Sequence, residues 1–326
     1  FAVGYEHREQ DGWFQPDAVV VAGESAGVPS SATSGGYEVD EFFLELNVPI
    51  LAEVPFANVL DFSYAIRSFD YDTIGSDNTD KLALRWKPIE DLMFRVSKSE
   101  GFRAPGIGEL FGSAARFDQT LDDPCSGLTA ASPAQLRSNC AALGVPTDGS
   151  YTQFNAQISV TTGGNSNLEA ETSESEMWGI VYSPSWVDNV GWIDGIEFEL
   201  NHFDIEVDGA IQALDAQVQL SGCAATLDTV LCDGISRTSG GVINGFANQL
   251  TNIGGIKTTG YDFTMTYASP DTSVGSFKLR WQTNILDEYT EIIPTENGFT
   301  ELEREGTEIG DPERSFPELK SNVYLD

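Results

Sequence analysis

Basic residues are scarce in this sequence. The chain of 326 residues has 17 lysines and arginines against 51 aspartates and glutamates, a formal net charge of -34. A nucleic acid needs a basic protein surface to neutralise its phosphates, so this balance argues against nucleic acid as a partner. His7 and His202 are the only histidines, and we expect no metal site and no cofactor.

Long apolar runs are missing too. No segment approaches 18 consecutive apolar residues, so the sequence predicts no transmembrane helix. A membrane β-barrel stays open as a fold class, because its strands give a much weaker hydropathy signal. The sequence starts at Phe1 without a signal-like leader and stops at Asp326 inside an alternating pattern, so we expect it to be part of a longer protein.

Catalytic signatures are also missing from the sequence. It contains neither a Gly-x-Ser-x-Gly elbow nor a glycine-rich phosphate loop. Adjacent carboxylates such as Asp122 and Asp123 lie in loop-like sequence, where solvated acids are far commoner than a glycosidase pair. We therefore do not expect an enzyme.

Only four cysteines occur, as two close pairs. Cys125 and Cys140 form one pair and Cys223 and Cys232 the other, both in irregular sequence without the spacing of a zinc site. Two local disulfides in an oxidising compartment, Cys125–Cys140 and Cys223–Cys232, fit this arrangement better.

The acid excess does not indicate a disordered chain, because 40% of the residues are hydrophobic and 11% are aromatic. Two explanations stay open. The charge keeps a protein soluble in a saline habitat, or acids are concentrated in exposed loops, where they select what approaches.

A period of two is what the sequence does contain. Apolar and polar residues alternate in segments such as 41–48, 58–67, 81–87, 92–99, 196–201, 261–267 and 277–282, which predicts strands with one apolar face. The apolar positions expected to form one lipid-facing band are Phe42, Leu44, Phe62, Tyr64, Leu84, Phe94, Phe198, Leu279 and Trp281. The polar positions expected to face a lumen include Arg67, Arg85, Arg95, Lys278, Arg280, Glu197 and Glu199.

Short and long connections alternate between these segments. The short ones are 49–56, 88–91, 183–191 and 269–274, and the long ones are 10–36, 70–78, 105–170, 209–243 and 287–317. In an antiparallel meander this places long loops on one rim and tight turns on the other, as in outer-membrane barrels. A soluble β-sandwich, the weaker alternative, has no reason to sort loops by end. Loop 105–170 is too long to be structureless, so we expect short elements within it.

Two strings are more specific than the periodicity. The first is Gly101-Phe102-Arg103-Ala104-Pro105 followed by Glu109-Leu110-Phe111, and the second is 163–173, which includes Asn165, Leu168 and Glu171. In this order they resemble the "FRAP…ELF" and "GNPNLKPE" segments of the TonB-dependent outer-membrane receptors. Ser166 and Ala170 stand where that family usually has proline, which softens two turns without threatening the fold.

The resemblance implies an all-β fold, an antiparallel up-and-down transmembrane β-barrel of about 22 strands with long loops on one rim. Residues 1–326 would be part of a single outer-membrane β-barrel domain and supply about ten of these strands. The plug domain, the TonB-contacting N-terminal region and the final strands would lie outside the sequence. The implied location is the cell outer membrane of a Gram-negative bacterium, in contact with lipid, lipopolysaccharide and, through the missing N-terminal region, the TonB complex.

The implied function is import of a small organic nutrient. Loop aromatics suited to stacking on a sugar or macrocycle are Trp13, Phe14, Phe111, Phe117, Tyr151 and Phe154. Because acidic loops repel anionic ferric siderophores, a carbohydrate or another neutral ligand is slightly preferred. The alternative is a passive porin or adhesin-type barrel without energy coupling.

Overall fold

The structure is a computed structural model that describes residues 1–26, 30–252, 254–273, 275–295, 298–310 and 313–326. Within these ranges no helix has the length and apolar character needed to cross a membrane. Most of the described residues are in strands.

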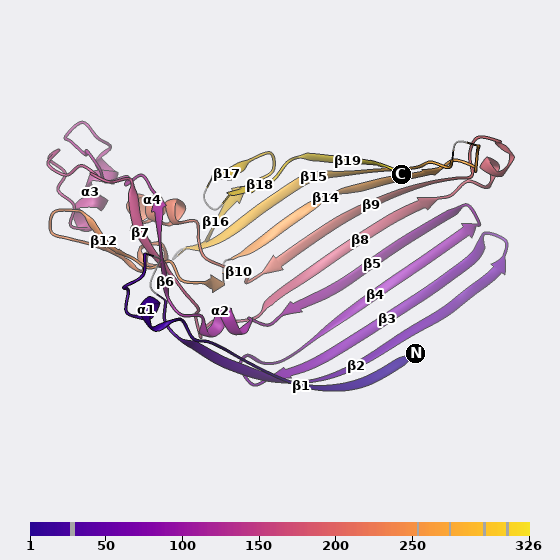
Figure 1. The fold of residues 1–326 in the computed structure, drawn as a ribbon, viewed down its shortest axis with the longest axis horizontal. Helices are drawn as coiled ribbons and strands as arrows, with labels where there is room; N and C mark the ends of the chain where they lie inside the picture. Colours follow the sequence, from indigo (N-terminus) through magenta and orange to yellow (C-terminus); the bar gives the residue numbers. More distant parts are fainter. Residues whose placement is uncertain (27–29, 253, 274, 296–297, 311–312) are drawn as a thin grey trace.

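One antiparallel sheet of eleven strands dominates the molecule, and we call it the wall (Figure 1). Its strands are β1 (Ala2–Phe14), β2 (Thr33–Val54), β3 (Ala57–Tyr71), β4 (Gly75–Ile89), β5 (Leu92–Arg103), β8 (Glu171–Tyr182), β9 (Gly195–Asp208), β14 (Gly255–Ala268), β15 (Lys278–Thr295), β16 (Gly298–Glu303) and β19 (Leu319–Leu325). They lie side by side in chain order, except that β16 and β19 both pair with β15, at residues 290–295 and 279–285. Without β16, ten strands cross the wall, as the sequence predicted.

The wall is open at both edges. Among the described residues, β1 pairs only with β2, and β19 pairs only with β15. An exposed strand edge carries unpaired N–H and C=O groups, which lipid cannot satisfy. The wall is therefore a part of a barrel and not a closed one.

The four connections predicted to be short gather at one end of the wall, which we call the turn end and which lies on the right in Figure 1. The residue pairs that close them are Val54–Ala57, Ile89–Leu92, Tyr182–Phe198 and Ala268–Lys278. The third connection contains the short helix η1 (Ser185–Asn189). All four short connections thus share one end, as predicted, although Val274 of the fourth is outside the described residues.

The first of these turns is tighter than expected. The sequence suggested a connection over 49–56, but β2 continues to Val54 and leaves only Pro55 and Phe56 in the turn. An irregular register between Pro49 and Leu51 lets the strand pass the proline, which has no N–H for the ladder.

The expected long loop 70–78 is wrong. β3 ends at Tyr71 and pairs there with Gly75, the first residue of β4, so only three residues turn the chain. Gly75 has φ +80°, a left-handed conformation that glycine adopts without strain. Loop 10–36 is also shorter than predicted, because β1 extends to Phe14 and β2 begins at Thr33, leaving α1 (Ala18–Val21) in between. Short and long connections therefore do not alternate strictly.

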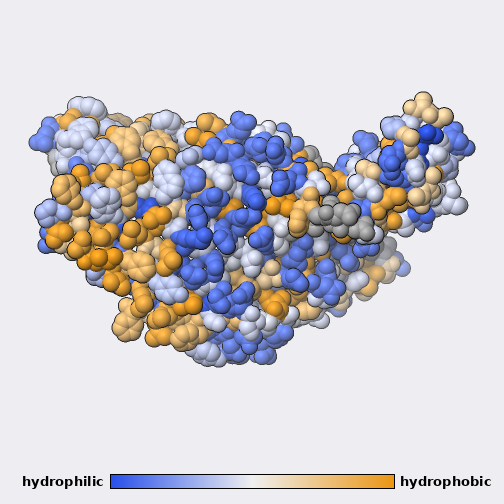
Figure 2. Space-filling model, turned by 180° about the vertical axis from the view of Figure 1, so that it is seen from behind, coloured by the Kyte–Doolittle hydropathy of each residue, from blue (hydrophilic) through white to orange (hydrophobic). Residues whose placement is uncertain are grey.

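Side chains of the wall alternate between two faces, and all nine residues predicted for one band share the same face. On this apolar face Phe62 pairs with Val48 on one side and Leu84 on the other. Leu84 and Trp281 stay 37% and 40% exposed, so no protein core covers them. Figure 2 shows hydrophobic residues gathered toward the turn end, with hydrophilic residues between them and the opposite end.

The strands are longer than a membrane is thick. β2 has 22 residues, and at about 3.3 Å per residue it is roughly 70 Å long, against an apolar band of about 25 Å in such barrels. On the same face of β2, the positions that precede Phe42 are acidic: Asp40 and Glu38. The part of the wall opposite the turn end therefore lies outside the apolar band.

Candidate functional site

The long loops at the other end of the wall, which we call the cap end, fold into a separate body, the outer cap (Figure 1). It consists of 104–170, between β5 and β8, and 209–252, between β9 and β14. The first loop holds α2 (Ile107–Phe111), β6 (Ala115–Thr120), α3 (Ala134–Ala142) and β7 (Gln157–Thr162). The second holds β10 (Ile211–Gln212), α4 (Ala216–Thr226), α5 (Thr229–Cys232), β11 (Ile235–Arg237), β12 (Ile243–Phe246) and β13 (Thr251–Asn252). A third loop carries β17 (Glu308–Gly310) and β18 (Glu313–Ser315).

The outer cap has a hydrophobic core. All four clusters of buried hydrophobic residues in the described chain lie at this end. One cluster joins Leu121, Ile158 and Val160 of the first loop to Ala216, Leu220 and Phe246 of the second. The two loops therefore bury each other's apolar side chains and fold as one body.

Both predicted disulfides are present, each within its own loop. Cys125 and Cys140 join the segment before α3 to that helix, and Cys223 and Cys232 join α4 to α5. Three of these cysteines are almost completely buried and belong to the core clusters. The disulfides thus fix the helices of the cap from inside.

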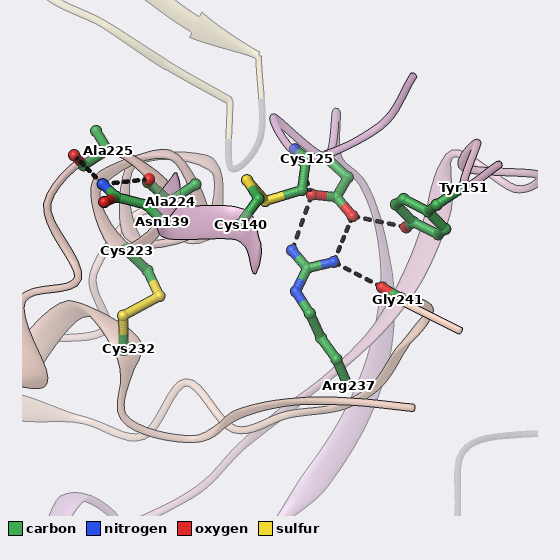
Figure 3. Close-up of a disulfide and its surroundings, with 11 residues drawn as sticks. Cys125, Asn139, Cys140, Tyr151, Cys223, Ala224, Ala225, Cys232, Arg237 and Gly241 are labelled. Atoms are coloured by element: carbon green, nitrogen blue, oxygen red, sulfur yellow. Dashed lines mark hydrogen bonds and ion pairs between the residues drawn. A yellow bond between two sulfur atoms is a disulfide. The ribbon is translucent and has the colours of Figure 1, made fainter. Parts of the chain in front are cut away.

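A buried ion pair links the two loops beside the first disulfide (Figure 3). The guanidinium of Arg237 donates to both carboxylate oxygens of Asp123, at 2.6 and 2.8 Å. The Tyr151 hydroxyl donates to the same carboxylate at 2.7 Å, and Arg237 also donates to the Gly241 carbonyl oxygen. The side chains of Arg237 and Asp123 are 4% and 0% exposed, so each charge depends on the other for stabilisation.

This burial changes how the acid groups titrate. Desolvation alone would raise the pKa of Asp123, but the hydrogen bonds from Arg237 and Tyr151 outweigh it and hold that pKa below its usual value. Burial, together with the Asp123 carboxylate, raises the pKa of Tyr151 to about 12. Asp123 is therefore charged and Tyr151 neutral through the physiological range.

The two loops also meet at a helix end. The side-chain amide of Asn139, on α3, donates to the carbonyl oxygens of Ala224 and Ala225 at 3.1 and 2.6 Å (Figure 3). These carbonyls lie in the last turn of α4, where no intrahelical donor reaches them. Asn139 is buried and so replaces the water that would otherwise satisfy that end.

The residues of the two sequence motifs meet at the base of the cap. Arg103, at the end of β5, forms ion pairs with Glu109 of α2 at 2.8 Å and with Glu171 of β8 at 2.5 Å. Glu171 also accepts a hydrogen bond from the Ile211 backbone, and Glu109 one from the Gly106 backbone. The motif carboxylates therefore hold the ends of three strands and one helix around Arg103.

The remaining motif residues pack around this ion-pair network. Leu110 and Leu168 form a buried cluster with Ile211, and Asn165 donates to the Leu250 carbonyl oxygen at 3.0 Å. Pro105 is buried two residues after β5 ends, where its missing N–H stops the ladder. Gly101, Phe102 and Ala104 complete the strand end and its exit, with the Phe102 ring 3.9 Å from that of Phe69. The motif residues thus stabilise the base of the first cap loop, where the loop leaves β5 and returns to β8.

The six loop aromatics form two separate groups. Trp13 and Phe14 end β1 and are 78% and 56% exposed, and Phe111 packs nearby against Gly35 of β2. Phe117 of β6, and Tyr151 and Phe154 before β7, lie farther along the first cap loop than Phe111. Tyr151 is buried through its bond to Asp123, whereas Phe154 is 82% exposed.

The other face of the wall, the charged face, carries the predicted lumen residues. Arg85 pairs with Asp61 there and Arg67 with Glu41, and Ser183 donates to Glu197 at 3.0 Å. Lys278 and Arg280 lie on the same face toward the turn end.

One of these contacts explains a glycine in the middle of a strand. Arg95 of β5 reaches across β8 to Glu199 and to Asn201 on β9, the latter at 2.7 Å. Gly179 lies between them on β8, and a Cβ there would meet the side chains of Arg95 and Asn201. Because residue 179 has no side chain, Arg95 of β5 can pass over β8 and bind residues of β9.

The family model for the β-barrel of TonB-dependent receptor-like proteins matches residues 1–326. The chain belongs to the TonB-dependent receptor family. Members of this family are transporters of the Gram-negative outer membrane, not enzymes, and they bind a ligand and interact with TonB. Membership favours the receptor over the passive porin or adhesin-type barrel.

Several solved structures are similar to this TonB-dependent receptor barrel. A mutant of the ferric enterobactin receptor PfeA of Pseudomonas aeruginosa, in complex with enterobactin, is 13% identical with a TM-score of 0.49, over 99% of this chain and 43% of that one. The siderophore receptor PirA of Acinetobacter baumannii is 12% identical with a TM-score of 0.48, over 90% of this chain and 35% of that one. This chain thus spans less than half of either receptor. A search of curated proteins finds no match.

The sequence did not identify the residues that join the two cap loops. Asp123 and Arg237 are separated by 114 positions, and only the absence of lysine between Lys98 and Lys257 sets Arg237 apart as one of few cations there. Asn139 gave no signal, because asparagine next to cysteine in a loop has many roles.

Proposed function

We propose that the receptor containing this chain takes up a neutral, hydroxyl-rich ligand such as a carbohydrate, and not an anionic ferric siderophore. The charged face of the wall would line the lumen, and the outer cap would make the first contact with the ligand. Coupling to TonB would come from a region outside this chain, and the apolar face would contact lipid and lipopolysaccharide.

The observation that carries this proposal is that the cations of the outer loops are already engaged. No lysine occurs between residues 99 and 256. Arg116 pairs with Asp118, Arg137 donates to the Ser132 carbonyl oxygen, and Arg237 is buried against Asp123.

The cations of the third outer loop are also engaged. Its two arginines, Arg304 and Arg314, both pair with the buried Glu291, at 2.7 and 3.2 Å. An anionic ligand needs cationic partners to compensate for the water it loses. The loops instead offer carboxylates, which repel it, and exposed aromatic rings, which suit the apolar side of a sugar.

Calorimetry on the full-length receptor tests the proposal. Neutral sugars should bind with an affinity that changes little with ionic strength. Ferric siderophores of net negative charge should bind weakly, and their affinity should rise with salt as the repulsion is screened. Tight siderophore binding that salt weakens would contradict the proposal.

A charge-reversal pair sharpens this test. Asp118→Lys with Asp148→Lys places new cations on exposed positions of the outer cap and should improve binding of an anionic siderophore. Glu90→Lys makes the same type of change at the turn end and should have no effect. An equal effect at both ends would indicate overall charge rather than the cap.

A further inference from the structure

One groove of the outer cap is lined without any charged residue. It lies between 151–159, which leads into β7, and 242–245, which includes the start of β12, and its volume is about 140 Å³. Four other cavities in the described part of the chain each have at least one acidic or basic lining residue. The chain has a formal charge of -34, so a cavity at the cap end without charged lining residues differs from its surroundings.

Phe154 lines this groove and is 82% exposed. The residue before it is held firmly: Gln153 donates from its backbone to the Ser126 hydroxyl and from its side chain to the carbonyl oxygens of Leu121 and Asn155. Its side-chain oxygen accepts from the Asp123 backbone at 2.8 Å. The exposed ring is therefore presented on a fixed backbone, so binding would cost little ordering entropy.

The opposite side of the groove is fixed by the buried ion pair. Arg237 belongs to β11, which pairs with β12, and it donates both to Asp123 and to the Gly241 carbonyl oxygen at the hairpin turn. A Cβ at Gly241 would lie 3.0 Å from the Tyr151 ring, so the hairpin packs directly on the floor of the groove. The ion pair of Arg237 and Asp123 thus holds the two sides of the groove together and fixes the width of the groove.

The lining matches the chemistry of a sugar ring. Gln157, Ser159 and Asn244 supply amide and hydroxyl groups that both donate and accept hydrogen bonds. Phe154 supplies an apolar face for stacking. Sites for drug-sized ligands occupy about 300 to 1,000 Å³, so a groove of about 140 Å³ suits a single ring and excludes a whole siderophore.

We propose that this groove binds one neutral sugar ring, stacked on Phe154 and hydrogen-bonded by Gln157, Ser159 and Asn244. This inference rests on the proposed function and locates the cap's contact with the carbohydrate.

The test is a titration of the full-length receptor, followed by saturation-transfer NMR. The probes are methyl β-D-glucopyranoside, D-galactose, D-xylose and N-acetyl-D-glucosamine, with D-glucuronate as the anionic counterpart. Phe154→Ala should weaken the best neutral sugar about fivefold or more, the loss of roughly 1 kcal/mol of stacking. Asn244→Trp fills the groove from an exposed position and should abolish binding.

Phe299→Ala is the matched control, because Phe299 of β16 is an aromatic residue of the cap end that is 68% exposed and does not line the groove. Its affinity should stay within twofold of the unmodified receptor. Sugar binding that survives both Phe154→Ala and Asn244→Trp, or that Phe299→Ala weakens equally, would overturn the groove but leave the proposed function intact. Failure of every sugar to bind, or tighter binding of glucuronate, would overturn both.

Discussion

The outer cap and the wall are stabilised in different ways, although one chain forms both. All four buried hydrophobic clusters of the described residues lie at the cap end, three of them wholly within the cap, which also holds two disulfides and a buried ion pair. In the wall, large apolar side chains such as Phe42 and Val96 are about half exposed, at 51% each. The cap therefore supplies its own core, whereas no protein core covers the apolar face of the wall in the described residues.

Ion pairs differ between the two regions in the same sense. Lys98 and Glu176 pair across β5 and β8 at 2.8 Å, with side chains 55% and 64% exposed. Arg237 and Asp123 lie at a similar distance but are almost fully buried. An exposed pair contributes little because water already solvates both charges, while a buried pair leaves a costly lone charge when one partner is removed.

The largest effect should follow from breaking the buried pair. Arg237→Met removes the cation and leaves Asp123 charged and desolvated, which should destabilise the outer cap by about 3 to 5 kcal/mol. Hydrogen exchange of the full-length receptor should then speed up throughout both cap loops and stay unchanged in the wall.

Arg116→Met is the control, since its pair with Asp118 is exposed on both sides. It should leave exchange of the cap as it is. Equal protection in the Arg237→Met and unmodified receptors would mean that the pair does not hold the two loops together.

The wall should be sensitive to charge on one face only. Leu84→Arg places a cation on the apolar face and should destabilise the barrel in lipid by about 2 to 4 kcal/mol if it lies near the bilayer centre. Ala83→Arg, one residue away on the charged face, should have a far smaller effect. Urea unfolding of the full-length receptor in liposomes measures both, and similar losses would contradict the assignment of the faces.

The contrast also explains what the sequence could predict. Period-two segments located the wall strands, because one face must be apolar along the part that meets lipid. The sequence predicted a loop for the outer part of β1, from Gln10 to Phe14, and for the hairpin at Gly75. Those residues carry no apolar alternation, and the structure makes them strands through backbone pairing with β2 and across the Gly75 hairpin.

The outer cap was less predictable for a different reason. The close cysteine pairs identified both disulfides, because each partner is local in sequence. The contact of Asp123 with Arg237 joins two loops, and neither local sequence contains the information that pairs them. Tyr151 looked like an exposed loop aromatic for the same reason, since its burial depends on that distant arginine.

The disulfides should matter for the cap and not for the wall. The bonded cysteines are 15 and 9 residues apart, so the chain-entropy model gives about 3 and about 2.6 kcal/mol of stabilisation. Replacing Cys125 and Cys140 together by alanine should raise proteolysis within 105–170. The barrel should keep its normal mobility on detergent gels, where the folded barrel in an unheated sample migrates differently from the heated, unfolded one. Loss of that mobility would show that the wall depends on the cap.

The smallest expected effect is a pH window for the outer cap. The pKa of Asp123 is lowered from 3.8 in the folded protein by Arg237 and Tyr151, so its contribution is complete above about pH 4 and is lost as the pH falls through the folded value. The pKa of Tyr151 is raised from 10.0 to about 12, so its contribution is complete below pH 10 and is lost as the pH rises toward 12. Hydrogen exchange of the cap, corrected for the intrinsic pH dependence, should therefore be slowest between about pH 4 and pH 10.

Two variants assign the two limits of this window. Asp123→Asn should remove the acid limb, the rise in exchange below about pH 4, and Tyr151→Phe should remove the alkaline limb, the rise above about pH 10. The barrel strands near Leu84 should show neither limb. An acid limb that persists in Asp123→Asn would place the responsible carboxylate elsewhere in the cap.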